Sequence, residues 1–332
     1  MSQMITAKDV AKIAKVSTSA VSRAFTPGAS ISEETRRKVL KVSEEMGYQP
    51  NLIARGLRRK HSGLIGFGML RTDHPTSLQI QQDFVRQFQE LGYSTLILNI
   101  MDAEHIDEAL PQAFQYSIDG LILVAAGLMD KLVESCAKMK VPVVLLKNYS
   151  LSGRVHSVCC DNRGGGRIAA EAFVNAGMKR LAYITGSEET YTNRDRETGF
   201  RDVLKANNLE LIARENGDFT YESGYQAAMR MFQNHKDIEG LFCASDLMAL
   251  GAMDAVRHEF GMGIPEDLSV IGFDNIPMAA WPSYDLTTIN MPNEALVNAA
   301  VGLVMEAIES DTEEAVLKFF PGKLIHRSST RF

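Results

Sequence analysis

The chain of 332 residues is too long for one ordinary hydrophobic core, and its 45% apolar and 23% charged residues are typical of a globular protein, which excludes disordered and fibrous classes. It holds no run of about 18 apolar residues, and charges are spaced through its N-terminus, so we expect a cytoplasmic protein without membrane span or signal peptide. Residues 1–60 carry 12 basic and 5 acidic side chains (net +7), whereas the remainder carries 23 and 36 (net −13), which favours a polyanion as the partner of the first segment alone.

Capping and breaking residues predict three short helices at the start of the chain. Thr6 is placed to cap the first helix, and Ser17 to cap a second one over Thr18 to about Phe25. Ser32 should cap the third helix, which Gly47 ends. Two short helices across a tight turn are typical of a helix-turn-helix, whose second helix enters the major groove of DNA.

The second helix therefore supplies the predicted DNA contacts. Arg23 is the strongest candidate for reading guanine, because a guanidinium can bond both acceptors on that base. Capping and packing explain Ser17 and Ser22 almost equally well. The residues of this segment predicted to contact DNA are Thr6, Ser17, Thr18, Ser19, Ser22 and Arg23.

Two stretches, ITAKDVAKIAKVSTSAVSRAF and SEETRRKVLKVSEEMGYQPNLIARGLRRKHSGLIGF, resemble the opening of the lactose/galactose repressor (LacI-type) family. They carry a VSxxxVSR pattern over 16–23 and a GYxPNxxARxL pattern over 47–57. The resemblance implies that Leu57 wedges between base pairs from the minor groove while nearby arginines hold phosphates. The DNA-contacting residues expected in this hinge are Asn51, Ala54, Arg55, Leu57 and Arg58. The alternative is a flexible basic linker without a DNA role.

From Leu64 onward, apolar runs alternate with longer helical segments. The runs are LIGFGML, STLILNI, GLILVAA, VPVVLL, SVCCD, RLAYITG, GLFCAS and LSVIGFD, with LKFFP and KLIHR near the end. Apolar runs of this length predict parallel strands buried on both faces, hence an α/β, doubly wound class with room for two sheets. Ligands of such folds lie beyond the carboxyl ends of the strands.

Polar and charged residues at those strand ends give the predicted effector site. Its members are Leu70, Arg71, Lys147, Asp161, Arg194, Arg196, Phe219, Ser245, Asp246 and Asp274. The motifs VCCDNRGGGRIAA, RDRETGF, FCASDLMALGA, IPEDLSVIGFDN and LTTI occur in the order of the same family, whose body is a two-lobed periplasmic-binding-protein-like domain.

The resemblance also implies the domain boundaries. We expect a helix-turn-helix domain over 1–50, a hinge over 51–61 and an effector-binding and dimerisation domain over 62–332. Lobe 1 should comprise about 62–160 plus 291–320, and lobe 2 about 161–290 plus 321–332.

By resemblance, Arg196 bonds the effector, Phe219 stacks on it and Asp274 accepts its hydroxyl or ring N–H groups. An ion pair within the cleft is the alternative for Arg196, and helix capping explains Asp246 as well as binding does. Lys147 stands where relatives that bind neutral sugars often carry an acid. We therefore expect an anionic effector, such as a sugar acid or sugar phosphate, unless Asp161, Asp218 and Asp274 neutralise the cations.

These patterns predict a DNA-binding regulator that acts as a repressor of a metabolic operon and binds near-palindromic operator DNA as a homodimer. We expect no cofactor, metal or membrane partner and no enzymatic activity. A nucleotide-dependent α/β enzyme is the first alternative, because Gly164–Gly166 follow a strand and could admit a phosphate, although GxGxxG spacing is lacking. A sugar-binding module without a DNA role is the second.

Overall fold

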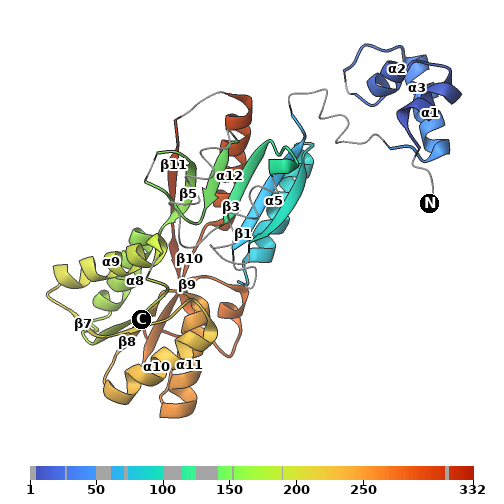
Figure 1. Cartoon of the computed structure of the whole chain (residues 1–332). Helices are drawn as coiled ribbons and strands as arrows, with labels where there is room; N and C mark the ends of the chain where they lie inside the picture. Colours follow the sequence, from blue (N-terminus) through green and yellow to red (C-terminus); the bar gives the residue numbers. More distant parts are fainter. Residues whose placement is uncertain are drawn as a thin grey trace. The chain divides into compact units, whose positions relative to one another are not determined.

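The structure is a computed structural model of the chain. It describes residues 5–26, 28–49, 61–70, 74–100, 114–124, 141–151, 153–188, 190–310 and 314–332. Two compact units are distinct, Met1–Gly63 and Leu64–Phe332, and each is treated by itself (Figure 1). Of the predicted hinge over 51–61, only His61 lies within the described residues.

The smaller unit is a three-helix domain, as its capping residues predict. Its helices are α1 (Ala7–Ala14), α2 (Thr18–Ala24) and α3 (Glu33–Met46). The Asp9 carboxylate accepts hydrogen bonds from the backbone N–H (2.8 Å) and hydroxyl (2.6 Å) of Thr6, and the Ser17 hydroxyl accepts one from the backbone N–H of Ala20 (3.2 Å). These bonds satisfy N–H groups that a helix start leaves without partners.

A small core holds the three helices together. It consists of the buried side chains of Val10, Ala11, Ala14, Val21, Ala24 and Val39. Arg36 on α3 adds a polar contact, because its guanidinium donates to the carbonyl oxygen of Ala24 at 2.9 Å. The unit thus has a core of its own, which fixes the angle at which α2 is presented.

The larger unit contains two six-stranded sheets. The first has the order β11-β5-β4-β3-β1-β2 and is parallel throughout. Its strands are β1 (Leu64–Leu70), β2 (Ser94–Ile100), β3 (Gly120–Val124), β4 (Val143–Leu146), β5 (His156–Asp161) and β11 (Leu317–Pro321). Helices α5 (Ser77–Glu90) and α12 (Asn293–Glu309) pack against this sheet, and together they form what we call lobe 1.

The second sheet has the order β12-β10-β9-β8-β6-β7 and is parallel except for β12, which runs antiparallel to β10. Its strands are β6 (Leu181–Thr185), β7 (Leu211–Asn216), β8 (Gly240–Cys243), β9 (Ser269–Asp274), β10 (Thr287–Asn290) and β12 (Lys323–Ile325). Its helices are α8 (Asn162–Asn175), α9 (Tyr191–Ala206), α10 (Tyr221–Asn234), α11 (Asp246–Phe260) and the short η1 (Pro277–Ala280). Figure 1 shows α8 and α9 on one side of this sheet and α10 and α11 on the other, and the assembly is lobe 2.

The α/β class and the helix-turn-helix are confirmed, with two strands that were not predicted. β7 is an edge strand whose half-exposed residues, LIAREN, lack the apolar run of a central strand. β10 begins with two buried threonines, Thr287 and Thr288, which sequence reasoning does not separate from a loop. The chain passes between the lobes after Asp161, after Asn290 and after Pro321.

Glycines in lobe 2 permit the close packing of α8 and α9. A Cβ built on Gly166 would lie 2.1 Å from the carbonyl oxygen of Arg196, and one on Gly199 would lie 2.0 Å from that of Arg163. A Cβ on Gly165 would meet the ring of Phe273. The glycine run over 164–166 is thus explained by packing. No helix of the described ranges is long and apolar enough to cross a bilayer.

Candidate functional site

The smaller unit offers the start of α2 as a DNA-reading surface. Thr18 and Ser19 are exposed there and Arg23 is exposed in the last turn of the same helix, while Val21 and Ala24 face the core. The hydroxyls of Ser17 and Ser19 lie 2.8 Å apart, so Ser17 both caps the helix and positions its neighbour. Ordered caps leave α2 with a fixed, polar N-terminal face, which suits a helix that enters a major groove.

The other predicted DNA contacts have different settings. Thr6 lies at the start of α1, where it binds Asp9. Ser22 is half-buried, and its carbonyl accepts a hydrogen bond from the Thr26 hydroxyl at 2.9 Å. The hinge residues Asn51, Ala54, Arg55, Leu57 and Arg58 lie outside the described residues. So does Arg71 among the predicted effector residues, and of Leu70 only its backbone, at the end of β1, is described.

In the larger unit, four side chains from the two lobes meet at the carboxyl ends of strands, and we call them the interlobe cluster: His74, Lys147, Arg196 and Asp274. Asp274 ends β9 of lobe 2, and its carboxylate lies 3.6 Å from the Arg196 guanidinium of α9. The same carboxylate lies 3.4 Å from Nε2 of His74, which precedes α5 in lobe 1. Arg196 and Asp274 are both buried, so water screens their attraction little.

Arg196 is fixed by three further contacts. Its Nε donates to the side-chain oxygen of Asn162 at 2.9 Å, and its Nη1 donates to the carbonyl oxygen of Ala244. Its guanidinium lies over the ring of Phe273 at 3.6 Å from the centroid. An arginine held in this way presents its remaining N–H groups in one direction, which is the geometry needed to bind an oxygen ligand.

Lys147 contributes a second basic side chain, from lobe 1. It follows β4 with a φ of 63°, in the left-handed region that side chains other than glycine rarely adopt. Its Nζ donates to the Thr76 hydroxyl at 3.1 Å. Asp274 also has a positive φ, of 114°, so two members of the cluster sit in strained backbone, as residues of binding sites often do.

The charges of the interlobe cluster influence one another. Burial alone would raise the pKa of Asp274, but Arg196, His74 and Lys147 outweigh it, so the pKa is lowered and the carboxylate stays ionised at neutral pH. Burial lowers the pKa of Lys147, although Asp274 opposes that effect. Two basic side chains and a histidine thus surround one carboxylate, so basic groups outnumber acidic ones in the cluster.

Two predicted effector residues instead form hydrogen bonds within lobe 2. Ser245 caps α11, its hydroxyl accepting from the backbone N–H of Met248 at 3.4 Å. Asp246 is fully buried, and its two oxygens accept hydrogen bonds from the backbone N–H of Ile276 (2.8 Å) and the Thr288 hydroxyl (2.6 Å). Both oxygens have protein partners, so the geometry favours a supporting role for Asp246 over direct binding.

The remaining described candidates are Asp161, Phe219 and Arg194, and each contacts a residue outside the interlobe cluster. Asp161 caps α8 by accepting from the backbone N–H of Gly164 at 2.8 Å. Phe219 is half-buried with a φ of 70°, and its ring lies against Gly186. The exposed Arg194 places its guanidinium 5.0 Å from the centroid of the Tyr191 ring.

Sequence reasoning missed three members of this region: His74, Thr76 and Asn162. His74 and Thr76 lie four and six residues beyond β1, and Asn162 directly follows β5. The rule that ligands lie beyond strand ends would have included them if applied to every polar residue of these connections.

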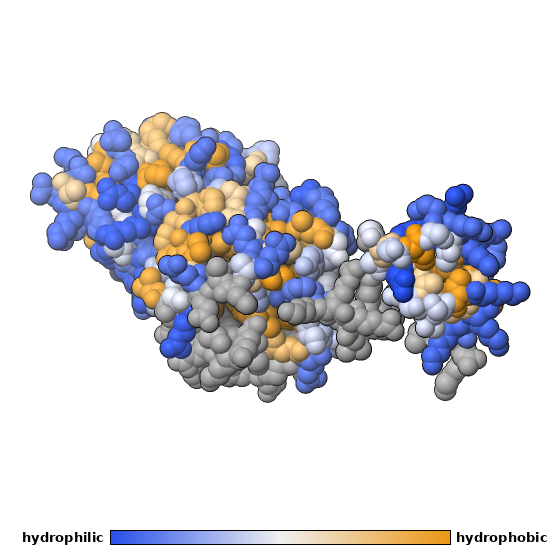
Figure 2. All heavy atoms as spheres, turned by 90° about the horizontal axis from the view of Figure 1, so that it is seen from above, coloured by the Kyte–Doolittle hydropathy of each residue, from blue (hydrophilic) through white to orange (hydrophobic). Residues whose placement is uncertain are grey.

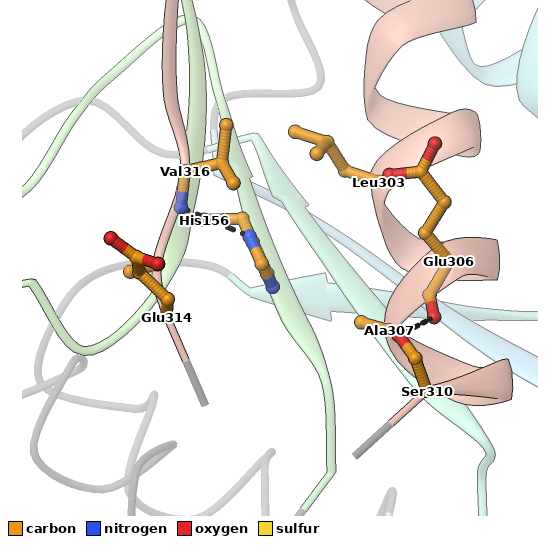
Figure 3. Close-up of a pocket in the computed structure, with 8 residues that line it drawn as sticks. His156, Leu303, Glu306, Ala307, Ser310, Glu314 and Val316 are labelled. Atoms are coloured by element: carbon orange, nitrogen blue, oxygen red, sulfur yellow. Dashed lines mark hydrogen bonds between the residues drawn. The ribbon is translucent and has the colours of Figure 1, made fainter. Parts of the chain in front are cut away.

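A pocket of about 630 Å³ lies elsewhere in lobe 1 (Figure 3). It is lined by His156, Leu303, Glu306, Ala307, Ser310, Glu314, Ala315 and Val316. Since His156 begins β5, the pocket belongs to the end of that strand opposite Asp161. Among the predicted effector residues whose side chains are described, none lines it.

The fold and the two sites define a DNA-binding regulator with a ligand-sensing body, and comparisons agree. Residues 6–51 match bacterial regulatory proteins of the lacI family, and residues 170–330 match a periplasmic binding protein-like domain. The HTH-type transcriptional repressor PurR of Aliivibrio fischeri is 31% identical over 335 residues, covering 98% of each chain. The chain belongs to the lacI family of transcription regulators and is not an enzyme.

Solved structures give the same result. The lac repressor dimer bound to operator and the anti-inducer ONPF matches with a TM-score of 0.90 at 27% identity, covering 99% of both chains. A sugar-binding lacI-family regulator from Escherichia coli, complexed with phosphate, matches with a TM-score of 0.71 at 26% identity, covering 81% of this chain and 98% of that one. The predicted resemblance to the family is confirmed.

Proposed function

We propose that the protein is a homodimeric repressor of a metabolic operon, that it reads a near-palindromic operator in the cytoplasm, and that its effector is anionic. The observation that carries the effector class is the convergence of His74, Lys147 and Arg196 on a single carboxylate, Asp274. Guanidinium and ammonium groups bind carboxylates and phosphates through charge-assisted hydrogen bonds. A sugar acid or sugar phosphate fits this chemistry.

A neutral sugar is the competing ligand class, because Asp161, Asp218 and Asp274 together could neutralise the cations. Asp161 is engaged as a helix cap, and Asp218 accepts hydrogen bonds from Thr220. Asp274 forms an ion pair with Arg196. This distribution supports the anionic class, as does the phosphate bound by the Escherichia coli relative.

Calorimetry with glucose, gluconate and glucose 6-phosphate tests the effector class. We expect an acidic ligand to bind more tightly than glucose, and Lys147→Gln to weaken its binding about tenfold, since one charge-assisted bond is lost. The matched control is Lys179→Gln, at an exposed lysine of lobe 2. Tighter binding of the neutral sugar would reject an anionic effector.

DNA reading is assigned to α2, with Arg23 as the residue that discriminates bases. Fluorescence anisotropy with a library of operator variants should show that Arg23→Ala relaxes the preference at one base pair by about 1–3 kcal/mol. Arg37→Ala is the control, because it removes the same charge from an exposed arginine of α3. If both variants reduce affinity equally for every sequence, Arg23 does not read a base.

The dimer is supported by the lac repressor dimer among the relatives and by exposed apolar side chains of lobe 1. Leu78 on α5 is 62% exposed and Ile97 on β2 is 49% exposed. Figure 2 shows apolar side chains among hydrophilic ones on the surface of the larger unit. In such a dimer the effector acts by binding one arrangement of the lobes more tightly than the other.

A further inference from the structure

Outside the interlobe cluster, a tyrosine of lobe 1 binds an aspartate of lobe 2. Tyr149 follows β4 and is 8% exposed, and its hydroxyl donates to the Asp195 carboxylate of α9 at 2.9 Å. Its ring stacks on that of Tyr191, also on α9, with centroids 5.0 Å apart and planes 28° apart. One residue thus makes a polar and an aromatic contact across the junction of the lobes.

The surroundings of Tyr149 hold it in this position. The ring of Phe319, on β11 of lobe 1, meets it edge to face at 5.3 Å, so the tyrosine is supported from its own lobe. On the far lobe, the Arg194 guanidinium lies 5.0 Å from the Tyr191 ring. Burial, with help from Asp195, raises the pKa of Tyr149, so its phenol keeps the proton that it donates.

The two residues of this contact are close in sequence to two members of the interlobe cluster. Tyr149 lies two residues after Lys147, and Asp195 directly precedes Arg196. The hydrogen bond therefore joins the two segments that carry Lys147 and Arg196 of the interlobe cluster. The backbone at Lys147 cannot move far from the backbone at Arg196 while the bond is intact, because each lies within two residues of a bonded side chain.

We propose that Tyr149 and Asp195 form a latch between the lobes that fixes the spacing of Lys147 and Arg196. Both are positioning residues: they hold the two cations at the separation that an anionic group bridging the lobes requires. Binding of such a ligand is strengthened because the segments that carry the two cations lose less conformational freedom when the ligand binds. The latch itself rests on contacts within the chain, and only its effect on ligand choice rests on the proposed anionic effector.

Hydrogen exchange of the full chain tests the latch without any ligand. Tyr149→Phe removes the hydrogen bond and keeps the ring, and Asp195→Leu removes the acceptor at similar size. We expect amides in 147–151 and 191–196 to exchange several-fold faster in both variants, while those of β8 and β9 are unchanged. The matched control is Tyr221→Phe, because Tyr221 donates to Asp254 at 2.7 Å in the same way but within lobe 2.

The ligand readout is calorimetry with inorganic phosphate and glucose 6-phosphate. We expect Tyr149→Phe to weaken the binding of the phosphate-bearing probe several-fold, and Tyr221→Phe to leave it unchanged. Unchanged exchange in 191–196 for both latch variants would overturn the latch. Faster exchange in a protein that prefers glucose would support the latch and reject the anionic effector, so the two ideas fail separately.

Discussion

Asp274 is buried beside Arg196 and His74, so it links residues of both lobes through one carboxylate. Removing its charge leaves the Arg196 guanidinium buried without a counter-ion, which is among the costlier changes a protein interior can suffer. The ligand binding proposed at this position therefore depends on a group that the fold also needs. The two roles can be separated because they are measured by different experiments.

We expect Asp274→Asn to lower the free energy of unfolding by about 3 kcal/mol, because it breaks a buried ion pair. The response of operator binding to effector should also be lost, while operator affinity itself is retained. Urea unfolding and fluorescence anisotropy measure the two effects. The control is Asp237→Asn, whose carboxylate pairs with Arg180 at the exposed surface and should change little. A fully stable Asp274→Asn protein would contradict the ion pair.

Asp246 should make the stability of the protein depend on pH, because its pKa is raised, whereas the pKa of Asp274 is lowered. Burial raises its pKa well above the ordinary value of about 3.9, so the folded state binds a proton more readily than the unfolded chain. Between about pH 4 and its raised pKa, its contribution to the free energy of unfolding therefore falls as pH rises. Asp246→Asn keeps one acceptor oxygen and should flatten that decline relative to the native chain.

Urea unfolding from about pH 4 to 7 measures this difference, since the groups shared by the two proteins cancel. Asp237→Asn again serves as the control and should keep the native slope over this range. Parallel curves for Asp246→Asn and the native chain would mean that Asp246 titrates as an ordinary carboxyl.

The site residues were predictable from the sequence only in part. Arg196 and Asp274 follow from strand ends and from motifs of the family, because the fold places the carboxyl ends of parallel strands at one edge. His74 and Asn162 did not follow, because their contacts depend on how two lobes meet and on loop conformation, which no periodicity encodes. Buried Asp246 was indistinguishable in sequence from an exposed one.

At the scale of elements, the crossing of α8 and α9 determines where Arg196 points. Gly199 lies one turn after Arg196 on α9 and touches the backbone of α8. We expect Gly199→Ala to lower the free energy of unfolding by about 1–3 kcal/mol, because a Cβ there forces the helices apart. Effector affinity should fall with it, since the displaced helix carries Arg196.

Denaturant unfolding and calorimetry check this prediction. The matched control is Gly302→Ala on α12, where an added Cβ meets no atom within 4 Å. That change should be neutral or stabilising by up to about 1 kcal/mol, as expected for alanine in an open helical position. Equal effects of the two substitutions would show that helix propensity, and not packing, controls the result.

Elements buried on both faces were the predictable ones. β8 and β9 are apolar throughout and buried throughout, so their runs identify them. β7 is half-exposed at the edge of its sheet, and its sequence carries Arg214 and Glu215. A polar edge strand protects against pairing with other chains, and the same polarity hides it from sequence patterns.

At the scale of the whole molecule, the two units differ in charge. The smaller unit, which we call the head, has a net charge of +7, and the larger unit, which we call the body, has a net charge of −13. DNA therefore attracts the head and repels the body. Each unit also has its own core, with Val10, Val21 and Val39 in the head and two sheets in the body. This division could be predicted from the sequence, because the charge of a segment and its apolar runs do not depend on the conformation of loops.

The division predicts the behaviour of a fragment that begins at Leu64. We expect the 64–332 fragment to unfold at the same urea concentration as the body of the full chain and to bind effector equally well, since the core of that unit is retained. It should show no binding to operator, because the net positive segment has been removed and the remaining net negative charge repels phosphates. The full chain, in contrast, should lose operator affinity linearly in log salt concentration as counterions are released from DNA. Salt-sensitive operator binding by the fragment would mean that the acidic body contacts DNA directly, and the head would then not be the reader on which the effector acts.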